Sequence, residues 1–113
     1  MTLYSNINAL IERLNHELEN LESELSQSIE LIRARINLFP ENLILIQLFA
    51  TFNNYILFAG NTRRKVNEIE RYLNKKDLSD DELQEAGGDL SEQLGRVLEA
   101  KIIVSNIKER LES

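Results

Sequence analysis

Apolar residues recur every three or four positions along three long stretches of this chain. In the first stretch, from about Ser5 to Leu38, steps of three and four alternate, as they do where one face of a helix packs on a neighbouring helix. One extra step of four, from Leu25 to Ile29, is a stutter that would locally unwind a supercoil. The apolar positions are Ile7, Ile11, Leu14, Leu18, Leu21, Leu25, Ile29, Ile32, Ile36 and Phe39. The pattern predicts one long helix.

The second stretch runs from about Glu41 to Asn74 and follows Pro40, whose ring disfavours a helical residue before it and so ends the first helix. Arg63 stands at a gap in the second apolar pattern, and Gly60 lies inside it. A glycine within a helix costs roughly 1 kcal/mol relative to alanine, so the pattern leaves open whether the helix continues through Gly60. The apolar positions are Leu45, Leu48, Phe52, Ile56, Ala59, Val66, Ile69 and Leu73.

A third helix is predicted to begin after a turn at residues 75–78. Ser79 and Glu82 have the spacing of a capping box, in which each side chain accepts a hydrogen bond from the other residue's backbone N–H. Gly87 and Gly88 leave two alternatives, one kinked helix or a short helix followed by a longer one. The apolar positions are Leu83, Leu90, Leu94, Val97, Val104 and Leu111.

Short turns between long helices make neighbours antiparallel. The sequence therefore predicts an all-α fold, an antiparallel bundle of three long helices in a single domain spanning residues 1–113. Folding the last two helices about residue 77 places Gly60 beside Gly95, which would let these helices approach closely. The same register sets the basic residues of segment 63–76 against the acidic residues of segment 77–92, so we expect ion pairs between the second and third helices.

The second helix carries more apolar surface than one small bundle can cover. Between residues 43 and 58 apolar side chains point to nearly every side, and a helix of this kind is normally buried all round. The third helix has a similar excess within residues 97–107. We therefore expect a homodimer, or docking of a helical protein partner; the alternative is a monomer in which the first helix covers this surface. The candidate partner-binding residues are Ile46, Ala50, Asn53, Leu57, Leu98, Ile102 and Ile103.

Asn53 and Asn54 lie within this apolar region. A buried asparagine can fix the register of paired helices. In the alternative interpretation, one of the two is solvated and the other is bonded to a neighbour.

Composition excludes several other functions. The net charge of −6 argues against nucleic-acid binding. The lack of cysteine excludes disulfides and thiolate chemistry, and it is compatible with the cytoplasm, where we expect the protein. The most apolar run, Leu43 to Gly60, is interrupted by Gln47, Thr51 and two asparagines, so we interpret it as a buried helix of a soluble protein and expect no membrane partner.

Candidate chemistry is sparse. His16 is predicted to be exposed, and the run His16-Glu17-Leu18 resembles the start of the phosphoacceptor box of sensor histidine kinases, which would imply a phosphoacceptor histidine. The resemblance covers three residues and then departs, because Glu19, Asn20 and Leu21 replace the arginine, small polar residue and proline of that box. A signalling or regulatory domain that uses His16 or the basic cluster at residues 63–65 is the alternative function.

A small helical enzyme ranks third. Arg33, Arg35, Arg63 and Arg64 are the only clustered candidates for holding substrate carboxylates. One histidine cannot complete a di-iron site of the helical-bundle type. We therefore predict a non-enzymatic interaction module with no catalytic, cofactor-binding or metal-binding residues.

Overall fold

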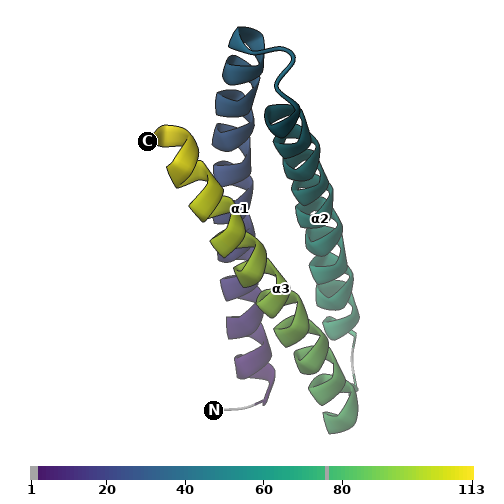
Figure 1. Ribbon diagram of the computed structural model, residues 1–113. Coiled ribbons are helices and arrows are strands. Elements are labelled where there is room, and N and C mark those ends of the chain that lie inside the picture. Colours follow the sequence, from purple (N-terminus) through teal and green to yellow (C-terminus); the bar gives the residue numbers. More distant parts are fainter. Residues whose placement is uncertain (1–2, 76) are drawn as a thin grey trace.

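The computed structural model describes residues 3–75 and 77–113. It contains three helices, α1 (Leu3–Leu38), α2 (Leu43–Leu73) and α3 (Asp80–Glu112), which run antiparallel in chain order in an elongated bundle of 58 × 21 × 15 Å (Figure 1). The predicted all-α bundle of three long helices is confirmed. α2 passes through Gly60 and α3 through Gly87 and Gly88 without interruption.

Helix α1 forms the centre of the bundle. Its predicted apolar positions from Ile7 to Ile32 are buried, and Ile36 packs against the core from a partly buried position. Both α2 and α3 pack mainly on α1 and touch each other far less. In Figure 1, α3 crosses α1 so that the C-terminus lies on the side of α1 away from α2. The expectation that Phe39 continues the apolar pattern is wrong, because α1 ends at Leu38 and Phe39 is 59% exposed.

Side chains near the chain reversals fix where the second and third helices begin. The Asn42 Oδ1 accepts hydrogen bonds from the backbone N–H groups of Ile44 (3.0 Å) and Leu45 (3.2 Å), so α2 starts two residues later than its predicted boundary. The capping box at Ser79 and Glu82 is confirmed. Asp77, in the turn before it, has a positive φ of 65°, a left-handed conformation that aspartate tolerates better than most residues.

The buried face of α2 is narrower than predicted. Its core positions recur every seventh residue, at Leu45, Phe52, Ala59, Val66 and Leu73. Ile56, predicted to be in the core, is instead 43% exposed, and the gap assigned to Arg63 is filled by Thr62, which is 3% exposed. The reason is that α2 packs mainly on one neighbour, which covers one row of side chains and leaves the adjoining row at the rim.

The predicted register of α2 and α3 is confirmed, but their predicted close approach at glycine is wrong. Phe58 and Arg96 line one groove between these helices, and Ile69 and Ala86 line another; in each pair the two residues are about equally far from residue 77 along the chain. A Cβ atom placed on Gly60 or Gly95 would meet no atom within 4 Å. These glycines therefore mark open surface.

Opposite charges do face each other between α2 and α3, since Lys65 lines the same groove as Glu85 and Asp89, but the expected ion pairs between these helices do not form among the described residues. Among the described residues, the ion pairs that join different helices run to α1, from Arg63 to Glu22 and from Lys101 to Glu17 at 2.9 Å. Because α1 lies at the centre, its carboxylates are within reach of both neighbours. A direct polar link between α2 and α3 is the hydrogen bond that the Tyr72 hydroxyl donates to Glu82.

Candidate functional site: an apolar surface on the second helix

Exposed large apolar side chains gather in one part of the bundle. All such residues in the described chain except Tyr4 fall within residues 38–57 or 102–103. Helix α2 supplies Leu43 (72% exposed), Ile44 (69%), Ile46 (43%), Ile56 (43%) and Leu57 (64%). Soluble monomers rarely expose a large contiguous apolar patch that has no function, so this surface is the candidate site.

The prediction that the run from Leu43 to Gly60 is a buried helix is wrong for the single chain. Only 17% of the most apolar window of α2 is buried, and by length and composition alone α2 could cross a membrane. No charged residue stands between Glu41 and Arg63. The reason for the exposure is again that α2 is covered mainly on the side that faces α1.

The four candidate partner-binding residues of α2 share one face. At 3.6 residues per turn, Ile46, Ala50, Asn53 and Leu57 lie roughly 100° to 160° around the helix from the core residue Phe52. Leu43 and Gly60 extend this row at its two ends. We call this row the outer stripe, which comprises Leu43, Ile46, Ala50, Asn53, Leu57 and Gly60.

Of the two asparagines in this region, Asn54 is exposed and Asn53 is partly buried. The Asn53 side-chain amide donates a hydrogen bond to the carbonyl oxygen of Phe49 at 2.9 Å. The interpretation with one solvated and one locally bonded asparagine therefore holds in the single chain. The Asn53 Oδ1 remains as an acceptor.

The three candidates on α3 do not join the outer stripe. Ile103 lines the groove between α2 and α3, whereas Ile102 is 62% exposed and lies roughly 100° further around α3. Leu98 is partly buried and packs against the core, so it presents less surface than Ile102. The structure thus brings the four α2 candidates together and separates them from those of α3.

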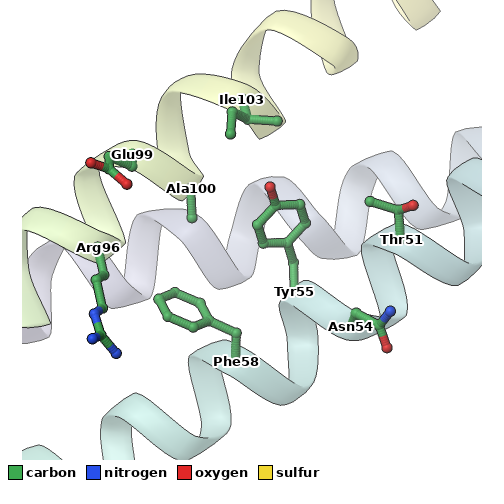
Figure 2. A pocket seen from close by; sticks show the side chains of 8 residues that line it. All are labelled: Thr51, Asn54, Tyr55, Phe58, Arg96, Glu99, Ala100 and Ile103. Carbon is green, nitrogen blue, oxygen red and sulfur yellow. The ribbon is translucent and has the colours of Figure 1, made fainter.

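A groove that the sequence pattern does not predict lies between α2 and α3, an open depression of about 380 Å³ (Figure 2). The rings of Tyr55 and Phe58 extend from α2 toward Ala100 and Ile103 on α3. Tyr55 meets the core residue Phe52 edge-on, with ring centroids 6.3 Å apart. The apolar residues within 51–58 indicate that α2 has a second apolar side. They do not indicate that α3 leaves that side uncovered.

The arginines that could have formed an anion site do not converge. Arg33 lies over the Phe49 ring at 5.5 Å, and Arg35 donates a hydrogen bond to the Leu111 carbonyl oxygen. Arg63 pairs with Glu22 on α1, and Arg64 donates to the side-chain oxygen of Asn61 at 3.1 Å. The basic cluster at residues 63–65 is therefore split between two surfaces.

His16 is exposed, as predicted. Its Nε2 lies 3.3 Å from the side-chain nitrogen of Asn20, one turn along α1. Among the described residues, no group of three or more histidine, aspartate or glutamate side chains is placed to hold a metal ion.

A polar junction closes the opposite end of the bundle. The Tyr72 hydroxyl donates to one oxygen of Glu82, and the other oxygen accepts from the Ser79 backbone N–H (3.3 Å) and hydroxyl (3.1 Å). These bonds lower the pKa of Glu82, with the Tyr72 bond the largest cause, and the same bond raises the pKa of Tyr72. The junction is accounted for by its role in fixing the turn between α2 and α3.

Comparisons with protein-family models, with curated proteins and with solved structures found no match to this chain.

Proposed function

We propose that this protein is a non-enzymatic interaction module that self-associates as a homodimer through the exposed apolar surface of α2, with the neighbouring part of α3 at the same level. The observation that carries the proposal is the exposure of five large aliphatic side chains on the first half of α2, in a stretch without charge. Closed two-fold dimers are the commonest soluble oligomers.

The magnitude of this exposure is of the size that association requires. Leu43, Ile46, Ile56 and Leu57 lie within one half of the helix circumference, and their exposed fractions amount to about two whole residues. Burying one such residue contributes about 1.5–3 kcal/mol, so burial on both copies would contribute about 7–13 kcal/mol, against an association cost of about 4–15 kcal/mol. A dimer that forms at micromolar concentration is consistent with this balance.

The surroundings of the apolar surface also suit an interface. Glu30 and Arg33 of α1 border it on one side, and Arg96 and Glu99 of α3 border the groove on the other. An interface typically has a core depleted of charge and a polar rim. Charged residues of both signs around the uncharged surface of α2 match that organisation.

Light scattering after size-exclusion chromatography tests the proposal. We expect the wild type to elute with twice the chain mass of 13.1 kDa, and the double variant Leu57→Asp/Ile102→Asp to elute as a monomer with unchanged helicity by circular dichroism. Ala9→Asp is the control, since Ala9 is exposed near the other end of α1 and the variant should remain dimeric. A wild type that is monomeric, and that instead partitions onto lipid vesicles, would show that a bilayer and not a second copy covers this surface.

A further inference from the structure

We infer that the occupant of the outer stripe is the α2 helix of a second copy, packed antiparallel about a two-fold axis that passes between residues 51 and 52. This inference rests on the proposed function and specifies which surface meets which.

The outer stripe has the spacing of a coiled-coil contact. From Leu43 to Gly60 its steps are three, four, three, four and three, an alternation typical of paired helices. The inward face of α2 already has its own row, at intervals of seven residues from Leu45 to Leu73, and that row packs into the core. Helix α2 therefore carries two contact rows, and this chain covers one of them.

The stripe complements itself when its direction is reversed. Overlaying it on a reversed copy, end to end, sets Leu43 opposite Gly60 of the second copy, Ile46 opposite Leu57, and Ala50 opposite Asn53. The space above Gly60 is open, with nothing within 4 Å of a Cβ position, and can receive a leucine side chain. Ala50, next to the axis, allows the two backbones to approach. A larger side chain therefore meets a smaller one at the ends of the stripe and near the axis, and Ile46 packs on Leu57 between them.

The flanks of the stripe select the antiparallel orientation. One flank carries the amides Gln47, Asn54 and Asn61, and the other carries Phe49 and Ile56. A two-fold axis perpendicular to the helices brings each flank against the same flank of the second copy, so amides meet amides and apolar residues meet apolar residues. A parallel pair would set each amide flank against an apolar flank, which leaves polar groups without partners.

The charged residues of α1 are also placed to pair across this two-fold axis. Helices α1 and α2 are antiparallel, and Phe49 lies beside Arg33 and Arg63 beside Glu22. The point on α2 through which the axis passes is therefore level with about residue 32 of α1. Glu30 and Arg33 lie on either side of that level and line the groove between α1 and α2 together with Ile56. The two-fold operation therefore brings Glu30 of each copy toward Arg33 of the other, and opposite charges face each other twice.

Disulfide cross-linking tests the orientation cleanly, because the chain has no cysteine of its own. The variants are Ile46→Cys, Leu57→Cys and the double variant. In the inferred dimer, position 46 faces position 57 of the second copy. Each position is about 16 Å, measured along the helix, from the same position of the second copy, which is too far for a disulfide. We expect mild oxidation to convert most of the double variant to a covalent dimer, with at least tenfold less from either single variant.

Two other results would overturn the inference while leaving the proposed function intact. Efficient cross-linking of Leu57→Cys alone would indicate a parallel pair, and a dimeric protein that cross-links in none of the variants would indicate a different surface.

The variants Leu57→Asp and Ile102→Asp, made separately, provide a second readout. We expect Leu57→Asp to weaken dimerisation at least a hundredfold and Ile102→Asp to weaken it less than tenfold, because Ile102 lies on the neighbouring part of α3 and off the stripe; the reverse order would also overturn the inference. A wild type that is monomeric in solution would refute the proposed function together with the inference.

Discussion

Replacing Ser28 by alanine should stabilise the fold. Ser28 is fully buried on α1, and its Oγ atom has no hydrogen-bond partner. A buried polar group without a partner costs about 1–3 kcal/mol, and alanine is also the better helix former by a few tenths of a kcal/mol. Removing one oxygen leaves a small void that offsets part of this gain. We therefore expect the free energy of unfolding to rise by about 1–2 kcal/mol.

Ser23→Ala is the matched control for helix propensity. Ser23 is on the same helix but exposed, and its hydroxyl makes only a long 3.4 Å hydrogen bond, from Gln27. This variant should gain only the propensity difference, so subtracting its effect isolates the contribution of burial at Ser28. Each kcal/mol corresponds to a shift in Tm of about 4 °C for a chain of this length.

The assay is urea denaturation followed by circular dichroism at one fixed protein concentration, because association also stabilises the folded state. An increase in stability for Ser28→Ala beyond that for Ser23→Ala supports the described packing between α1 and its neighbours. If Ser28→Ala is less stable than the wild type, the Ser28 hydroxyl has a hydrogen-bond partner and the reasoning is refuted.

Three further predictions concern the exposed glycines, the turn and the charged rim. Gly88→Ala should raise the free energy of unfolding by about 0.5–1 kcal/mol, since a Cβ there meets nothing within 4 Å; destabilisation would reveal an unseen contact. The pKa of Glu82 is lowered in the folded protein, so its carboxylate stabilises the fold at pH values above its ordinary pKa near 4.5, and this stabilisation is lost as the pH falls through the folded-state pKa. The loss of unfolding free energy in Glu82→Gln, measured by urea denaturation, should therefore become smaller in acid. A loss that does not change with pH would contradict this prediction. Glu30→Arg and Arg33→Glu should each raise the dimer dissociation constant several-fold, measured by sedimentation, and the variant with both reversals should restore it. If the two losses add in the double variant, Glu30 of one copy does not face Arg33 of the other.

Local sequence signals were enough to predict the fold. The apolar periodicity identified the large buried side chains of α1 and α3, although not the buried Ser28, Ala86, Gln93 and Ala100, and the capping box at Ser79 and Glu82 located the start of α3. These signals work because helix periodicity and capping depend on residues within a few positions of one another.

The angle at which α3 crosses α1 could not be predicted in this way, since the side chains at the contact determine crossing angles. Two errors follow from that missing angle: the expected contact of Gly60 with Gly95 and the expected ion pairs between α2 and α3. Thr62 shows a related limit. A polar residue in a core position interrupts the apolar pattern, so the sequence does not reveal that Thr62, and not Arg63, fills the gap.

The candidate site was predicted in part. The excess of apolar residues on α2 was visible in the sequence, because a charge-free helix that is apolar on several sides exceeds what one bundle can bury. Their division among separate surfaces depends on where α1 and α3 lie, which is also why Leu98 is partly buried against the core while Ile102 is exposed. Ile102 and Ile103 are adjacent in sequence but point to different sides of α3.

Sedimentation equilibrium of the wild type over a range of concentrations tests the central claim, self-association, most directly. The account predicts a monomer–dimer equilibrium in which the mass at tens of micromolar approaches twice 13.1 kDa. A mass of one chain throughout that range would contradict it.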